Sequence, residues 1–118
     1  MIPFNNRFHG HSSLSYVYKN GDVVRSHLAT IKVIKNEKRK NSRIAVVISK
    51  KVMKSAVRRN LIRRRVYEII RPDLPRLKYI YDIVIIISSG EAYTTTYDDL
   101  SKQINTLLKQ VGVKRSKK

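Results

Sequence analysis

The pattern of apolar and polar positions along the chain predicts three strands. Residues 27–34 and 44–48 are short runs rich in β-branched side chains, and 80–87 is apolar almost throughout. A near-continuous apolar run of this length is typical of a strand that is buried on both faces. The basic segment 36–42 lies between the first two runs and predicts a hairpin connection, which would make those strands antiparallel neighbours.

Apolar side chains that recur every three or four positions predict three helices, over residues 12–20, about 55–71 and 95–111. Each is followed by a residue that ends helices, namely Gly21, Pro72 and Gly112. The second helix is expected to have two distinct faces. Its apolar stripe consists of Ile62, Val66, Ile69 and Ile70. Its opposite face carries Asn60, Arg63, Arg64, Tyr67 and Arg71.

These elements follow the order α-β-β-α-β-α, with neither an internal repeat nor a linker-like break. The order predicts an α+β fold, a single-domain α-β sandwich over residues 1–113, with 114–118 as a basic tail. No apolar run approaches the ~18 residues of a membrane-spanning helix. The chain also contains no cysteine. Both features fit a cytoplasmic protein without a membrane partner.

The distribution of charge indicates a binding protein rather than a generic small domain. The 118 residues include 26 Lys and Arg against 8 Asp and Glu, a formal net charge of +18. From Lys50 to Arg71 there are nine basic residues and a single acid, Glu68, whereas no basic residue lies between Tyr79 and Tyr97. A compact domain with so uneven a positive charge is expected to bind a polyanion, with nucleic acid as the first candidate.

Candidate catalytic groups are sparse. A two-metal nuclease needs several carboxylates that converge on Mg²⁺, but the acids here stand singly except for Asp98-Asp99, which suits a helix N-terminus. His9, His11 and His27 are the possible acid–base or metal-binding groups. The first two lie in a polar segment, where solvated or RNA-contacting imidazoles are the commoner interpretation. We therefore predict no catalytic residue on this chain.

The basic face of the second helix has almost no acids to pair with its arginines, so mutual repulsion makes it a poor purely structural choice. The arginine fork matches phosphate oxygens, and Asn60 and Tyr67 would add polar or stacking contacts to nucleic acid. On the first helix, Tyr18 shares the apolar stripe of Leu14 and Val17. Core packing and base stacking both remain open for this tyrosine.

A distinctive string of residues runs through this region. It consists of Ser49-Lys50-Lys51, then Ala56-Val57-Arg58-Arg59-Asn60-Leu61-Ile62-Arg63-Arg64, and finally Glu68. The string resembles the signature of the protein subunit of bacterial ribonuclease P: Ser-Lys-Lys, a short spacer, Arg-Asn-Arg-Ile-Lys-Arg and a downstream Arg-Glu. Leu61 and Tyr67 depart from it, and Arg63 replaces lysine. Weaker matches in the same order are Arg7-Phe8, Leu14-x-x-Val17-Tyr18-x-x-Gly21 and Arg43-Ile44-Ala45.

The resemblance implies a subunit of an endoribonuclease that removes the 5′ leader from precursor tRNA, with the chemistry carried by a catalytic RNA and Mg²⁺. It implies that the catalytic RNA is contacted by Lys50, Lys51, Arg58, Arg59, Asn60, Arg63 and Arg64. It also implies that Leu14 and Tyr18 line a cleft for the leader. The alternative function is that of a structural RNA-binding protein of ribosomal type, without a role in cleavage.

The resemblance further implies an unusual connection within the fold. The β-α-β crossover through the basic helix would be left-handed, as in the second domain of ribosomal protein S5. The general rule predicts the opposite hand, because about 98% of such crossovers are right-handed.

Overall fold

The computed structural model describes residues 11–35, 42–76 and 80–111. Its elements, in chain order, are α1 (His11–Asn20), β1 (Asp22–Arg25), β2 (Ala29–Lys35), β3 (Arg43–Ile48), α2 (Ala56–Ile70), the 3₁₀ helix η2 (Arg71–Arg76), β4 (Tyr81–Ile87), the 3₁₀ helix η3 (Gly90–Tyr93) and α3 (Tyr97–Gln110). Every predicted helix and strand is present, and the α+β class is confirmed. One short strand, β1, was not predicted. The proposed tail at 114–118 lies outside the described residues.

The four strands form one sheet in the order β1-β2-β4-β3. The predicted hairpin between β2 and β3 is wrong, because β4 lies between them, antiparallel to β2 and parallel to β3. The antiparallel hairpin partner of β2 is β1 instead. The physical reason lies in β4, whose apolar side chains are buried on both faces and therefore occupy a central position in the sheet.

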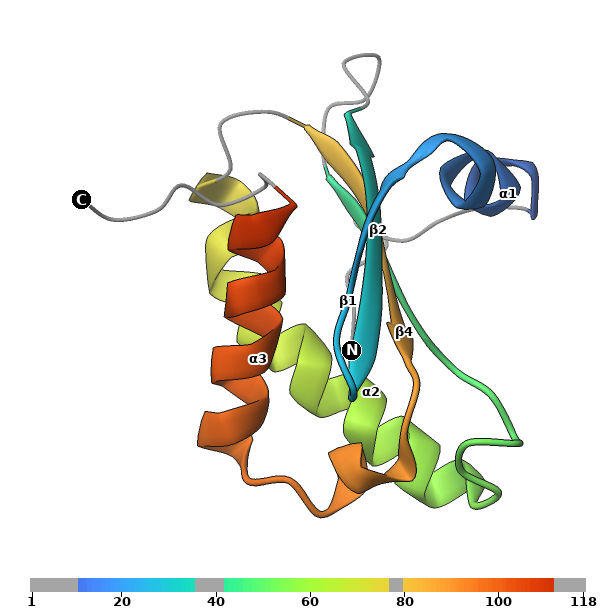
Figure 1. Cartoon of the computed structure of the whole chain (residues 1–118), viewed down its shortest axis with the longest axis vertical. Coiled ribbons are helices and arrows are strands. Elements are labelled where there is room, and N and C mark those ends of the chain that lie inside the picture. The colour runs from blue at the N-terminus through green and yellow to red at the C-terminus, as the bar shows by residue number, and fades with distance from the viewer. Residues whose placement is uncertain (1–10, 36–41, 77–79, 112–118) are drawn as a thin grey trace.

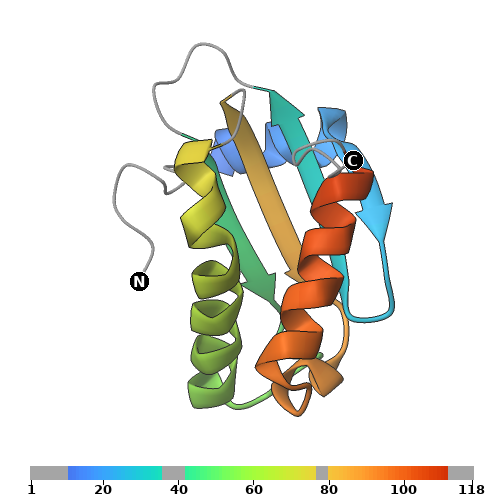
Figure 2. The same cartoon turned by 90° about the vertical axis from the view of Figure 1, so that its left-hand side faces the viewer.

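Helices cover both faces of the sheet (Figure 1). The helices α2 and α3 lie on one face and α1 lies on the other. In Figure 2, β3 and β4 both run downward, β4 lies to the right of β3, and α2 stands in front of them. That arrangement makes the β3-α2-β4 crossover left-handed. The hand implied by the family resemblance is confirmed, and the general expectation of a right-handed crossover does not hold here.

The apolar stripe predicted on α2 is buried in the core, together with the centres of β2, β3, β4 and α3. Tyr67 was expected on the solvent face of α2, but only 3% of it is exposed. Its place in the core reflects the packing of α2, which contacts η2 and α3 as well as the sheet and so buries a wider face than the stripe alone. Burial raises the pKa of the Tyr67 phenol above its usual value. The predicted contact of this ring with nucleic acid is therefore wrong.

The ends of the helices follow the predicted signals. Thr96 caps α3, with its side chain accepting a hydrogen bond from the Asp99 amide, and Asp98 also lies in the first turn. After α1, the Gly21 amide donates to the Val17 carbonyl at 2.9 Å. A Cβ atom at Gly21 would lie 2.7 Å from that carbonyl oxygen, so the close approach requires glycine.

A buried ion pair joins the two parallel strands. Arg43 of β3 and Asp82 of β4 are register partners, and both side chains are almost fully buried. The Arg43 Nε atom donates to Asp82 Oδ1 at 2.8 Å, and Nη2 donates to Oδ2 at 2.6 Å. This two-pronged contact holds the first residue of β3 to β4.

Candidate nucleic-acid interface

The predicted RNA-contacting residues lie on α2 and on the turn that leads into it. We call this set the basic surface, and it comprises Lys50, Lys51, Arg58, Arg59, Asn60, Arg63 and Arg64. Arg59 and Arg63 are half-buried and the other five are exposed. Ser55 begins α2 as its N-cap, with its hydroxyl oxygen accepting from the Arg58 amide at 3.2 Å. This cap fixes the start of α2 a few residues after the two lysines of the turn.

Arg59 fastens this turn to the helix. Its Nη1 atom donates to the main-chain carbonyls of Met53 and Lys54, at 2.9 and 2.8 Å. Within the turn, the amides of Val52 and Met53 both donate to the Ser49 carbonyl at 3.1 Å. The side chain of Arg59 thus fixes the backbone that presents Lys50 and Lys51. Sequence reasoning missed this positioning role, because the partners of Arg59 are main-chain carbonyls without a sequence signal of their own.

Two further arginines connect α2 to η3 through Tyr93. The guanidinium carbon of Arg58 lies 4.8 Å from the centroid of the Tyr93 ring, a cation–π contact. Arg65 Nη1 donates to the Tyr93 carbonyl at 3.1 Å. Arg58 and Arg65 therefore also stabilise the fold, because they hold α2 against η3. Arg65 and Tyr93 are 28 residues apart along the chain.

The opposite face of the sheet carries a second candidate site. Tyr18 of α1 is 37% exposed, and Lys32 Nζ of β2 lies 4.9 Å from the centroid of its ring. The neighbouring Val17 is fully buried and supplies the core contact of α1. Full burial of Tyr18 is thereby excluded, and its ring lies at the surface beside a cation. The side chain of Leu14, the other predicted leader contact, lies outside the described residues.

Lys32 was not predicted as part of this site, although the sequence carries a signal for it. Buried and half-buried residues alternate along β2, with Ile31 and Val33 buried on either side of Lys32. Since side chains of a strand alternate between faces, Lys32 belongs to the face away from the core that α2 and α3 cover. The alternation indicates the face of Lys32, and the packing of α1 against β2 in the tertiary structure brings it near Tyr18.

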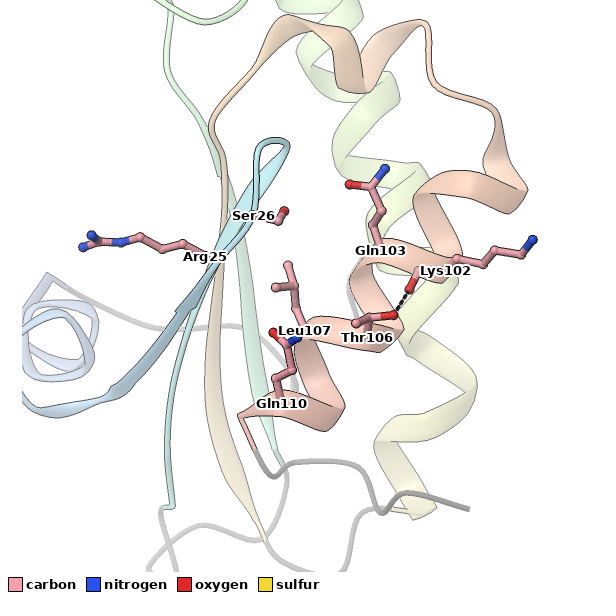
Figure 3. A pocket seen from close by; sticks show the side chains of 7 residues that line it. All are labelled: Arg25, Ser26, Lys102, Gln103, Thr106, Leu107 and Gln110. Atoms are coloured by element: carbon pink, nitrogen blue, oxygen red, sulfur yellow. Dashed lines mark hydrogen bonds between the residues drawn. The ribbon is translucent and has the colours of Figure 1, made fainter. Parts of the chain in front are cut away.

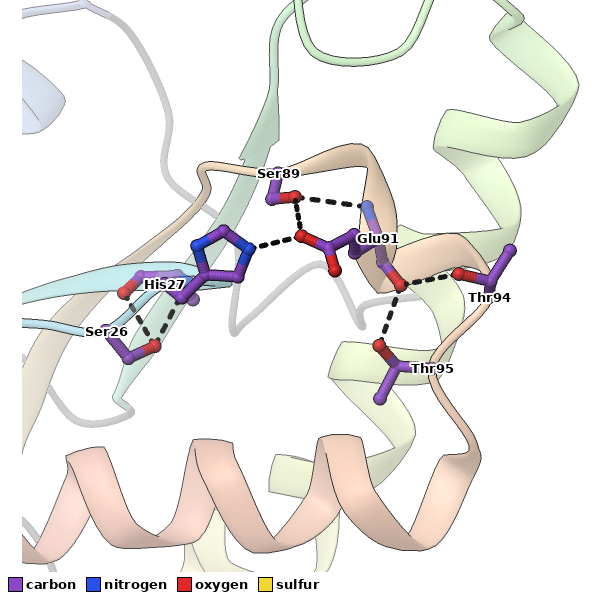
Figure 4. A network of polar contacts seen from close by, with 7 residues as sticks. Ser26, His27, Ser89, Glu91, Thr94 and Thr95 are labelled. Carbon is purple, nitrogen blue, oxygen red and sulfur yellow. Dashed lines mark hydrogen bonds and ion pairs between the residues drawn. The ribbon is translucent and has the colours of Figure 1, made fainter.

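His27 has a structural partner of its own (Figure 4). It lies in the turn between β1 and β2, and its Nε2 atom contacts the Glu91 carboxylate of η3. Ser89 donates to the same carboxylate at 3.2 Å. The hydrogen bond from His27, and next that from Ser89, hold the pKa of Glu91 below its usual range. Among the residues that the structure describes, no three His, Cys, Asp or Glu side chains are grouped to hold a metal ion.

A shallow hollow of about 240 Å³ lies between the β1–β2 turn and α3. In Figure 3, the side chains of Arg25 and Lys102 extend away from it in opposite directions. Its other lining residues are Ser26, Gln103, Thr106, Leu107 and Gln110. It includes neither a carboxylate nor an aromatic ring, so it offers no acid–base or stacking chemistry.

Comparison with known proteins identifies the family. The sequence profile of ribonuclease P matches residues 2–112. The ribonuclease P protein component of Pseudanabaena sp. (strain PCC 6903) is 31% identical over 113 residues, which cover 96% of this chain and 97% of that relative. The corresponding protein of Clostridioides difficile (strain 630) is 36% identical over 105 residues, which cover 86% and 88% of the two chains. This chain belongs to the ribonuclease P protein component family.

Solved structures of ribonuclease P proteins share the fold. The protein from Staphylococcus aureus superposes with a TM-score of 0.81 at 23% identity, covering 92% of this chain and 96% of that one. The protein from Thermotoga maritima superposes with a TM-score of 0.75, also at 23% identity, over 88% and 96% of the chains. The α+β sandwich predicted from the order of the elements is therefore confirmed.

Within the ribonuclease P protein fold, the two predicted sets of site residues lie on different elements. The basic surface occupies α2 and its preceding turn, on one side of the sheet, and Tyr18 lies on α1, on the other side. Two separate contacts with RNA are geometrically possible as a result. No helix in the described ranges is long and apolar enough to cross a membrane.

Proposed function

We propose that this chain is the protein subunit of a cytoplasmic ribonuclease P ribonucleoprotein, in which it binds the catalytic RNA and the 5′ leader of precursor tRNA. The observation that carries the proposal is the basic surface, in which the Ser55 cap and the Arg59 bonds hold the lysine-bearing turn against the start of α2. Family membership supports the identity of the partner.

The basic surface is suited to the phosphate backbone of folded RNA. Lys50, Lys51 and Arg64 are exposed, and each can neutralise a phosphate and release its condensed counterions. Arg59 holds the turn in place before RNA arrives, so little backbone entropy is lost when the lysines bind. The surface can therefore dock the protein on RNA by shape and charge, without reading bases.

The Tyr18 face is suited to a single strand. An exposed aromatic ring offers a stacking platform for a base, and the adjacent Lys32 offers a charge for the neighbouring phosphate. A leader lying along this face would contact the protein on the side of the sheet away from α2. The protein would then bind the catalytic RNA and the substrate leader at the same time, which raises the effective concentration of the substrate.

The chemistry in this proposal belongs to the RNA. The described residues lack a metal-binding group of side chains, so we derive no catalytic step through this chain. Mg²⁺ held by the catalytic RNA would supply the activation of water and the stabilisation of the leaving oxygen. The chain itself binds the catalytic RNA, orients the leader and neutralises phosphate charge.

The experiment is cleavage of a precursor tRNA at low Mg²⁺ concentration with the protein alone, the catalytic RNA alone, and both together. We expect leader removal to be stimulated only in the combined reaction. Cleavage by protein alone would contradict the assignment of the chemistry to RNA. Binding to the catalytic RNA without any stimulation would favour the ribosomal-type alternative.

A matched pair of variants tests the docking surface in the same system. Arg64→Ala removes an exposed cation of the basic surface, and Lys109→Ala removes an exposed cation near the end of α3. We expect Arg64→Ala to reduce the slope of log affinity against log salt by about 0.7–0.9 for each phosphate that the arginine neutralises. Lys109→Ala should leave the slope unchanged. If the salt slopes of both variants are equal, Arg64 does not neutralise a phosphate of the RNA.

A further inference from the structure

A second hollow, of about 290 Å³, opens between α2 and the first residue of α3. The two helices lie side by side on the same face of the sheet (Figure 2). The lining consists of Leu61, Arg64, Arg65, Glu68 and Tyr97. Tyr97 is 48% exposed, so its ring is accessible to a bound group. The volume is slightly below the ~300 Å³ of typical small-molecule pockets, so it suits a group of the size of a single base.

The charges around this hollow are arranged unevenly. Arg64 is exposed and belongs to the basic surface, whereas the Arg65 guanidinium already donates to the Tyr93 carbonyl. Glu68 contributes a carboxylate, whose Oε2 atom lies 3.1 Å from Nη2 of Arg71. The Glu68 carboxylate disfavours a phosphate at its own position, whereas the exposed Arg64 favours one at the rim. A flat, uncharged group with a donor at its edge is compatible with every lining residue.

We propose that the hollow holds one unpaired nucleobase of the catalytic RNA, stacked on Tyr97. This inference rests on the proposed function and adds a base contact to its phosphate contacts. Arg64 would bind the phosphate of the same nucleotide at the rim. The Glu68 carboxylate can only accept hydrogen bonds, so it favours a base that presents an amino group, as adenine, cytosine and guanine do.

The position of the hollow identifies the catalytic RNA, rather than the leader, as the source of the base. Arg64 is shared between the hollow and the basic surface, so RNA that docks on α2 reaches Tyr97 without leaving the protein. The α1 helix with Tyr18 lies across the sheet from both (Figure 1). Unpaired bases that stack on aromatic side chains are the usual route to sequence-specific recognition of RNA.

The test measures the affinity of the full chain for its catalytic RNA, without substrate, at several salt concentrations. We expect Tyr97→Ala to weaken binding about 5- to 150-fold, which corresponds to the loss of one base–aromatic stack. Tyr97→Phe should bind as the unmodified chain does, because its ring still stacks. The salt slope should be the same for all three proteins, because a stacking contact releases no counterions.

Tyr16→Ala is the matched control, since it removes another exposed tyrosine from α1, on the other side of the sheet. Its affinity for the catalytic RNA should be unchanged. A photoreactive benzoylphenylalanine at position 97 should crosslink to a single unpaired nucleotide of that RNA. Unchanged affinity of Tyr97→Ala, or a loss seen only with leader-bearing precursor tRNA, would overturn the inference. Failure of the unmodified chain to bind any catalytic RNA would instead refute the proposed function itself.

Discussion

The basic side chains of α2 differ in what their donors contact within the protein. Arg59 and Arg65 donate to main-chain carbonyls, Arg63 donates to the side chain of Asn60, and Arg58 lies over the Tyr93 ring. Arg64 is exposed at the edge of a hollow. Identical residue types in one short segment thus divide into those that support the surface and those that present charge on it.

Arg59→Ala is expected to loosen the turn before α2. Loss of a hydrogen bond from a charged group to the main chain costs at least about 1.5 kcal/mol, so the turn should open about tenfold more often. Amide hydrogen exchange of Val52 and Met53, measured by NMR without RNA, reports this opening directly. The same amides should be unaffected in Arg64→Ala. Unchanged exchange in Arg59→Ala would show that the turn is held by other contacts.

The Glu91 carboxylate is expected to make stability depend on pH. Its pKa is lowered in the folded chain, so its contribution is present above the ordinary glutamate pKa and is lost as pH falls through the lowered value. The unmodified chain should therefore melt at a higher temperature than Glu91→Gln at pH 7. The difference should shrink as pH falls below the ordinary glutamate pKa and vanish below the lowered pKa of Glu91. Thermal melts across this range test the prediction.

The partner of Glu91 provides the control for that experiment. In a chain that already carries His27→Ala, the substitution Glu91→Gln should change the melting temperature less, because the main hydrogen bond to the carboxylate is already gone. A difference between the unmodified chain and Glu91→Gln that is the same at pH 7 and pH 3 would contradict the titration of this group.

At the scale of elements, the strands depend on partners that lie far away along the chain. The apolar run 80–87 indicated a buried strand, and β4 is indeed at the centre of the sheet. Its antiparallel pairing with β2 and parallel pairing with β3 were not predictable from local patterns, because both neighbours present similar β-branched runs. The short β1 was missed because its four residues, Asp22–Arg25, are mostly exposed and carry little apolar periodicity.

Asp82→Ala is expected to destabilise the β3–β4 pair. Removal of one partner from a buried ion pair typically costs about 3–5 kcal/mol, because the remaining charge loses its counterpart in a medium that solvates it poorly. Urea denaturation of the unmodified chain and of Asp82→Ala measures the loss. The joint replacement Arg43→Met with Asp82→Leu should recover most of it, since both buried charges are then absent. A loss below about 1 kcal/mol for Asp82→Ala would show that the pair contributes little.

At the scale of the whole molecule, the sheet separates two surfaces of different character. The side covered by α2 and α3 carries the basic surface and the Tyr97 hollow. The other side carries α1 with Tyr18, and Lys32 beside it. A rigid sheet between them keeps both surfaces at a fixed relative orientation. A protein built in this way is suited to hold two RNA segments apart while it binds both.

Tyr18→Ala is expected to weaken the binding of precursor tRNA to the assembled ribonucleoprotein by about 5- to 150-fold, through the loss of one stacking platform. Mature tRNA serves as the control, because it carries no leader and its affinity should be unaffected. Equilibrium binding of both tRNAs to complexes that contain either protein measures the difference. If precursor and mature tRNA lose affinity equally, Tyr18 does not contact the leader.

The sequence by itself determined α1, α2, α3 and the strands β2, β3 and β4, the excess of charge on α2 and the family resemblance, because periodicity, caps and motifs are local properties of the chain. The tertiary structure decided the strand order, the burial of Tyr67 and the positioning role of Arg59. It also placed Tyr97 beside α2, although Tyr97 lies more than thirty positions after Arg64 along the chain. These outcomes depend on which distant segments pack together, and that choice is made by the burial of shared apolar surface rather than by any local pattern.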